Sequence, residues 1–192
     1  MTYAVVDSPL GPLTLVGTDM GGQPALAFAA RHPEATAAVV VMNSLLFGEA
    51  ETSWEIRILR QFGWNRLILR HLPRAVFRRA EKTFLPPGQK LPPDLRADFW
   101  QAFRRPEVRR FLVRLCAGYQ GRLATLPELY ARIRTPTLAL WGERDRHFPP
   151  IHARRLATTV PGARLELLSA GEHWMAWDRA GEVAERILRF AA

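Results

Sequence analysis

Cysteine, lysine and long apolar runs are all scarce in this sequence of 192 residues. The single cysteine, Cys116, excludes an internal disulfide and a paired-cysteine metal site, so we expect it to be a small buried core residue. No run of eighteen apolar residues is present, and the first residues lack the basic and apolar regions of a secretory signal. The sequence therefore predicts a globular, cytoplasmic protein with no membrane partner.

Basic residues outnumber acidic ones by 27 to 18, which gives a formal net charge of +9. Almost all of the basic residues are arginines. Clustered cations favour nucleic-acid binding because they release counterions from phosphates. Here the arginines alternate with large apolar residues, as in ILRQFGWNRLILRHLPRAVFRRAEK, which is typical of the solvated faces of amphipathic helices. No zinc, RRM or KH signature accompanies them. We therefore expect no nucleic-acid partner, and keep nucleic-acid binding by this basic region as an alternative hypothesis.

Cofactor motifs are missing as well. The sequence contains no metal-ligand cluster, no phosphate-binding loop and no dinucleotide fingerprint. A hydrophobic content of 48% is ample for a sizeable core. We therefore expect a globular protein that binds neither cofactor nor metal.

The first part of the chain has the order strand, helix, strand. The apolar run Leu13–Val16 ends at a glycine turn, a helical pattern extends from Gly22 to Arg31, and a second apolar run occupies residues 37–42. Two strands that flank one helix predict a βαβ unit, and hence a parallel sheet.

Residues 49–134 consist of arginine-rich helical patterns interrupted by prolines, which indicates an inserted helical cap. Thr52 and Glu55 have the spacing of a capping box that opens its first helix. The rest of the chain predicts strands at 137–141 and 164–168, each followed by a helix. We therefore expect an α/β fold with a partial parallel sheet of four strands, formed by residues 1–48 and 135–192, with the cap between them.

Polar residues directly after the strands are the first candidates for a site, because parallel sheets bind ligands beyond the carboxyl ends of their strands. Asp19 is the centre of a Gly-x-Asp-x-Gly turn after the first strand, where the glycines allow a tight elbow that exposes the central side chain. Asp145 follows the third strand, and His173 follows the fourth. The order along the chain is therefore nucleophile, acid, histidine.

Each candidate also has a plainer interpretation. Asp19 could cap the following helix, Glu143 is a rival for Asp145, and a loop histidine such as His173 is commonly solvated. His147 and His152 lie near the acid loop, where we expect surface positions for both. Only the combination of three strand-end motifs favours a catalytic interpretation.

These motifs resemble the α/β-hydrolase superfamily, in the branch of epoxide hydrolases and haloalkane dehalogenases, whose nucleophile is aspartate. LVGTDMGGQPALAFAARHPE resembles the nucleophile elbow and its helix. PTLALWGERDRHFP and AGEHWMAWDRAGEVAERILRF resemble the acid and histidine loops. The resemblance covers both ends of the chain, whereas the middle corresponds loosely to the variable cap. It implies an α/β-hydrolase fold in which Asp19, Asp145 and His173 are catalytic.

The resemblance also implies a mechanism. Asp19 attacks carbon to form an ester, and water activated by His173 hydrolyses that ester while Asp145 orients the ring. The backbone N–H of Met20 serves as an oxyanion donor. Tyr119 and Trp174 are the expected substrate contacts, although the sequence does not separate Trp174 from Trp141 and Trp177 in this respect. The expected partners are a small apolar substrate, most of all an epoxide, and water.

Departures from the family pattern define the alternatives. Met20 replaces the tryptophan that binds halide in haloalkane dehalogenases. Haloalkane dehalogenation is therefore less favoured than epoxide hydrolysis. The strands that normally precede the elbow, and the oxyanion loop among them, are absent before Asp19. We therefore expect the chain to be a fragment of a longer hydrolase. A non-catalytic hydrolase-like binding protein is the remaining alternative.

Overall fold

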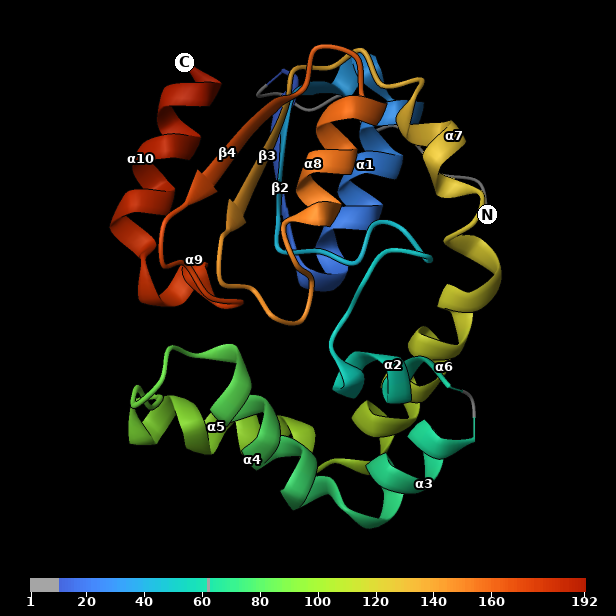
Figure 1. Ribbon diagram of the computed structural model, residues 1–192, viewed down its shortest axis with the longest axis vertical. Helices are drawn as coiled ribbons and strands as arrows, with labels where there is room; N and C mark the ends of the chain where they lie inside the picture. Colours follow the sequence, from blue (N-terminus) through green and yellow to red (C-terminus); the bar gives the residue numbers. More distant parts are fainter. Residues whose placement is uncertain (1–10, 62) are drawn as a thin grey trace.

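A single parallel sheet organises the molecule. The computed structural model describes residues 11–61 and 63–192. Its strands lie in the order β1-β2-β3-β4, and every neighbouring pair is parallel (Figure 1). Their bounds are Leu13–Thr18 for β1, Thr36–Met42 for β2, Thr137–Gly142 for β3 and Arg164–Leu168 for β4. The expected partial sheet of four parallel strands is therefore confirmed.

Helices cover both faces of the sheet (Figure 1). Helices α1 (Gly22–Arg31) and α8 (Ile151–Thr159) pack on one face, against Val39 and Val41 of β2. Helix α10 (Ala180–Ala191) packs on the other, where Val183 meets Val40 and Met42. Successive side chains of a strand point to opposite faces, so the uninterrupted apolar run of β2 fills both cores.

The segment between β2 and β3 is helical. It comprises α2 (Trp54–Arg60), α3 (Trp64–His71), α4 (Pro73–Phe84), α5 (Pro93–Phe103), α6 (Pro106–Arg122) and α7 (Leu126–Tyr130). Figure 1 shows α2 to α6 beyond the carboxyl ends of the strands. We call these five the cap helices. Proline stands at the start of α4, α5 and α6, where its missing N–H has no intrahelical partner to lose.

Two local features differ from the sequence expectation. Helix α2 is capped by Ser53, whose hydroxyl accepts a hydrogen bond from the Ile56 N–H, so the predicted capping box at Thr52 is wrong by one residue. Thr52 is buried, and Glu55 instead pairs with Arg79 of α4. A short helix, α9 (Met175–Asp178), precedes α10. No helix among the described residues is long and apolar enough to cross a bilayer.

Candidate active site

Asp19 lies in a tight elbow at the end of β1. Its φ is 49°, a left-handed conformation that few residues other than glycine adopt. The close turn depends on Gly17 and Gly22: a Cβ atom at Gly17 would lie 2.4 Å from the Gly21 carbonyl oxygen, and one at Gly22 would lie 2.1 Å from Ser44 Oγ. The glycines thus let the chain reverse sharply and leave the Asp19 side chain 40% exposed.

The other two candidates meet Asp19 from β3 and β4. His173 Nδ1 donates to Asp145 Oδ2 at 2.9 Å, and His173 Nε2 lies 3.9 Å from Asp19 Oδ2. Asp145 is buried, and its Oδ1 accepts from the backbone N–H groups of His147 and Phe148 at 2.8 and 3.0 Å. The rival carboxylate, Glu143, is exposed. The three residues chosen from the sequence therefore come together at the carboxyl edge of the sheet.

The pKa of His173 is set by burial and by the two neighbouring carboxylates. Burial by itself lowers the pKa of this imidazole, but Asp145, and then Asp19, outweigh that effect and raise the pKa to about 10. The two carboxylates therefore favour the protonated form of the ring. Any reaction that neutralises Asp19 removes one of the groups that raise this pKa, and so makes the imidazole a more readily available base.

Asn43, which follows β2, joins all three loops. Its carbonyl accepts the Asp19 N–H at 3.2 Å, and its side-chain Oδ1 accepts the Gly142 N–H at 3.1 Å. Its Nδ2 donates to the carbonyls of Glu172 and His173 at 2.8 and 3.2 Å. Asn43 is fully buried and has a φ of 42°. The sequence analysis missed it: its place directly after a strand marks Asn43 as a candidate, but the loops that it joins are not evident from the sequence.

We expect Asn43→Ala to lower the free energy of unfolding by about 2–4 kcal/mol, because it leaves buried backbone groups of two loops without partners. It also places alanine in a left-handed conformation that asparagine tolerates better. Urea unfolding measures the loss. Asn43→Asp is the matched control for shape: it retains the acceptor for Gly142 and loses both donations to the histidine loop. Unchanged stability in Asn43→Ala would contradict this role.

A cavity of about 400 Å³ opens onto Asp19 beneath the cap helices. Its wall is almost entirely apolar and includes Leu45, Ile56, Phe77, Phe99, Phe103 and Leu112. Cys116, buried as expected, also lines it. Arg60 is its one cationic lining residue among those described. Such a cavity accommodates a small apolar molecule with its reacting atom beside a carboxylate.

The remaining sequence candidates are placed as follows. Met20 and Trp174 both line the cavity. Trp141 is buried in the core, where its Nε1 donates to the Phe148 carbonyl, and Trp177 is exposed. Tyr119 belongs to α6, but its side chain lies outside the described residues. The oxyanion role of Met20 and the substrate contacts of Trp174 and Tyr119 stay predictions.

A comparison with protein families matches residues 3–180 to the α/β-hydrolase fold family. The chain belongs to this family. Two curated relatives are also similar to this chain. It is 28% identical over 172 residues to 2-hydroxy-6-oxo-6-phenylhexa-2,4-dienoate hydrolase of Comamonas testosteroni, covering 88% of the chain and 58% of the relative. It is 27% identical over 182 residues to 2-hydroxy-6-oxononadienedioate/2-hydroxy-6-oxononatrienedioate hydrolase of a Pseudomonas species, covering 93% and 62%. The chain thus spans about three fifths of these relatives.

Solved structures agree on the fold. A Rhodococcus 2-hydroxy-6-oxo-6-phenylhexa-2,4-dienoate hydrolase matches with a TM-score of 0.74 and 22% identity, over 93% of this chain and 64% of that one. A haloalkane dehalogenase variant from Agrobacterium tumefaciens matches with a TM-score of 0.76 and 20% identity, over 93% and 66%. The superfamily expected from the sequence is therefore confirmed. The curated relatives named above are hydrolases of oxo-dienoates rather than of epoxides.

Two further histidines, His147 and His152, are buried. The expectation that both lie at the surface is therefore wrong. His147 Nδ1 lies 2.9 Å from the Ser53 hydroxyl, and its Nε2 lies 3.1 Å from the Thr83 carbonyl. These contacts connect the acid loop to α2 and α4. His152 accepts from the Leu46 N–H and contacts the Glu51 carbonyl. Both rings are enclosed by segments distant in sequence, which local sequence does not reveal.

Acidification should weaken the fold through these two histidines. Burial lowers the pKa of His147 and of His152 to about 4, whereas the unfolded chain titrates near the ordinary value of 6.5. Between pH 6.5 and 4 the unfolded state takes up these protons and the folded state does not, so the free energy of unfolding falls as the pH falls. The total loss is about 3 kcal/mol for each histidine once the pH is below both pKa values. His173 acts oppositely: its raised pKa contributes stability that is lost as pH rises toward 10.

Urea unfolding between pH 7 and 4 measures this dependence. We expect His147→Gln to reduce the pH slope of the unfolding free energy by about one proton, or about 1.4 kcal/mol per pH unit. The exposed His71, changed to glutamine in the same way, is the matched control. Equal slopes for the two variants would contradict the assignment.

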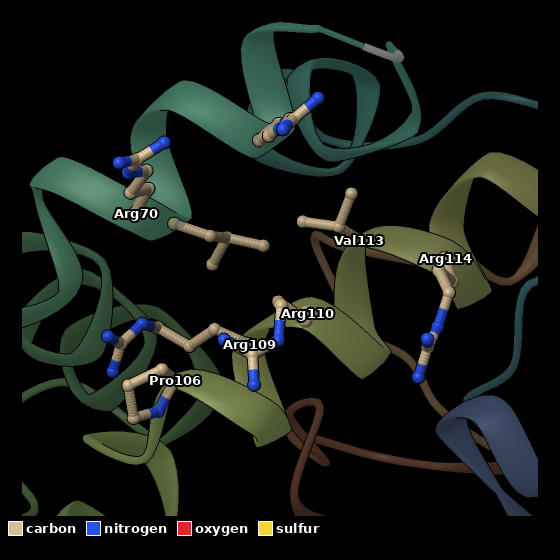
Figure 2. Close-up of a pocket in the computed structure, with 8 residues that line it drawn as sticks. Arg70, Pro106, Arg109, Arg110, Val113 and Arg114 are labelled. Carbon is tan, nitrogen blue, oxygen red and sulfur yellow. The ribbon is translucent and has the colours of Figure 1, made fainter.

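A second pocket, of about 660 Å³, lies between α3 and α6. Figure 2 shows Arg70 of α3 and Arg109, Arg110 and Arg114 of α6 around it, with Val113 between the two helices. None of the three candidate catalytic residues lines this pocket. It is therefore a feature of the cap surface, separate from the apolar cavity.

Proposed function

We propose that this chain carries the catalytic residues of a hydrolase that forms and hydrolyses an aspartyl ester on a small apolar substrate. The observation that carries the proposal is the Asp19 carboxylate at an apolar cavity, 3.9 Å from His173 Nε2, with His173 held by the buried Asp145. A carboxylate suits this chemistry because water can cleave its ester at the carbonyl carbon and regenerate the acid.

The reaction has two steps. An oxygen of Asp19 attacks an electrophilic carbon, the bond from that carbon to its leaving oxygen breaks, and the leaving oxygen takes a proton from solvent water. The hydroxide left in solution is neutralised by the proton that His173 releases in the next step. Esterification neutralises Asp19, so His173 can release its proton and then take one from water. The resulting hydroxide attacks the ester carbonyl, where we expect the N–H of Met20 to stabilise the negative oxygen. Release of the alcohol restores the carboxylate.

An epoxide is the substrate class we favour. The apolar lining and the carboxylate nucleophile support an electrophilic carbon without charge. A haloalkane is the alternative substrate class for the same mechanism, because a haloalkane dehalogenase variant shares the fold. Met20, which borders the cavity, offers no side-chain donor for a halide, and this favours the epoxide.

A second candidate reaction comes from the curated relatives. They are named for substrates that carry both a carboxylate and a ketone oxygen. Arg60 lines the cavity as its cationic residue, and its Nη2 donates to the Gly48 carbonyl at 2.9 Å. A substrate carboxylate near Arg60 would place the carbonyl toward Asp19, where Asp19 and His173 activate water directly.

Oxygen-18 water separates the two reactions. In a single turnover with excess enzyme and a styrene-type epoxide, we expect the product diol to contain ordinary oxygen, because its new oxygen comes from Asp19. After many turnovers, mass spectrometry should find label in the peptide that contains Asp19. The control is Asp19→Asn, which should give neither product nor label. Label in the first-turnover product, with none in Asp19, would reject the ester mechanism in favour of direct water attack.

A further inference from the structure

The cap carries a surface of exposed cations that form no close ion pairs within the described chain. Within the described chain, no ion pair within 4 Å involves the exposed guanidinium groups of Arg66, Arg70, Arg74, Arg104, Arg110 or Arg114, which we call the arginine surface. Glu107, the acid at the start of α6, pairs with Arg105 instead. Much of the net charge of +9 is therefore concentrated here.

The surface is continuous. Hollows lined by Arg66 and Arg70 adjoin the pocket between α3 and α6, which in turn shares Arg109 with a hollow lined by Arg74 and Arg104. Figure 2 shows arginine side chains spreading from both helices around this pocket. Figure 1 places α3 and the start of α4 at the end of the molecule farthest from the sheet. The cations thus line a connected series of hollows on the cap helices.

Large apolar side chains are exposed among these cations. Trp64 is 63% exposed, Leu67 53% and Leu72 55%. Trp64 and Leu67 line the same hollow as Arg66 and Arg70, and Leu72 lines the hollow of Arg74. Arginine interleaved with exposed tryptophan and leucine is the composition of helices that lie in a membrane interface, where the cations meet anionic headgroups and the apolar groups enter the acyl boundary.

We propose that the arginine surface docks the protein on an anionic lipid bilayer. Charge complementarity selects the acidic headgroups, and Trp64, Leu67 and Leu72 supply the apolar insertion that phosphate contacts alone would not require. Such a peripheral contact needs no spanning helix, and the proposal departs from the expectation of no membrane partner, which rests on hydropathy alone.

Leu69 links the arginine surface to the candidate active site. This residue lines both the arginine pocket and the cavity that opens onto Asp19, so the two adjoin at α3. An apolar substrate dissolved in a membrane would then lie close to the cavity. This role of the contact rests on the proposed function, whereas membrane binding itself is measured without any catalysis.

Co-sedimentation of the full chain with vesicles tests the proposal. We expect binding to phosphatidylcholine vesicles that contain phosphatidylglycerol, weakening with added salt, and little binding to pure phosphatidylcholine. Changing Arg66, Arg70, Arg110 and Arg114 together to glutamine should lower the affinity on the order of a hundredfold or more. The matched control changes four exposed arginines outside the cap helices, Arg31, Arg132, Arg154 and Arg164, and removes the same charge.

Equal loss of vesicle binding in both quadruple variants would overturn the proposal, because net charge alone would then explain it. So would salt-dependent binding to a single-stranded oligonucleotide without binding to anionic vesicles, which would identify nucleic acid as the partner. Trp64→Ser with Leu67→Ser provides an independent measurement. These exposed changes should leave unfolding by urea unchanged and still weaken vesicle binding at high salt, where insertion dominates. Undiminished binding there would contradict an apolar contribution.

Discussion

Replacing Asp19 by asparagine should lower kcat/KM for an epoxide by about ten-thousandfold or more, with little change in stability. Asparagine keeps the shape of the side chain and tolerates the left-handed backbone of the elbow, where φ is 49°. It lacks the charged oxygen that attacks carbon. Steady-state kinetics and urea unfolding of the same preparation measure the two effects separately.

Asp19→Ser sharpens this test. A serine could attack carbon only to form an ether, which water activated by His173 does not cleave, so the variant should also be inactive on an epoxide. On an ester or an oxo-dienoate, the same serine could form a cleavable acyl intermediate. Epoxide turnover by Asp19→Ser at the rate of the parent chain would show that Asp19 is not the nucleophile.

The second large effect is expected at His173. His173→Gln should form the ester and then stop, because the attack by Asp19 needs no base whereas hydrolysis of the ester does. Glutamine can still donate a hydrogen bond to the buried Asp145, which limits the cost of leaving that carboxylate without a partner. Intact-mass spectrometry should show one substrate mass added per chain, and kcat should fall by about a thousandfold.

The double variant Asp19→Asn with His173→Gln is the control, and it should gain no mass. His71→Gln, which changes an exposed histidine of α3, should turn over as the parent chain does. A His173→Gln variant that neither accumulates the ester nor loses activity would remove His173 from the mechanism. Loss of activity without added mass would instead assign His173 to the first step.

The candidate site illustrates how a histidine can change function during one reaction. Two carboxylates raise the pKa of His173 in the resting state, and they differ in what the reaction does to them. Asp145 is buried, accepts two backbone hydrogen bonds and forms no bond with the substrate in the proposed reaction. Asp19 loses its charge when the ester forms. In the proposed reaction, Asp145 therefore orients the ring throughout, while loss of the Asp19 charge controls when the ring acts as a base.

Local sequence determined much of the secondary structure of this chain and the choice of its candidate site residues. The strands at β3 and β4 and the helix α1 follow from short apolar runs, glycine turns and periodicity, which depend on neighbouring residues alone. Asp19, Asp145 and His173 could be selected because parallel strands present their carboxyl ends at one edge, whatever the details of packing. Their contact within a few ångströms is a consequence of that topology.

Only the tertiary structure decided the rest. Asn43 joins three loops, and His147 is enclosed between the acid loop and two cap helices, because segments far apart in sequence meet there. Ser53 rather than Thr52 caps α2, since the packing of the cap buries Thr52. Burial of a polar side chain depends on which distant backbone groups satisfy its hydrogen bonds, and no local pattern of residues encodes that pairing.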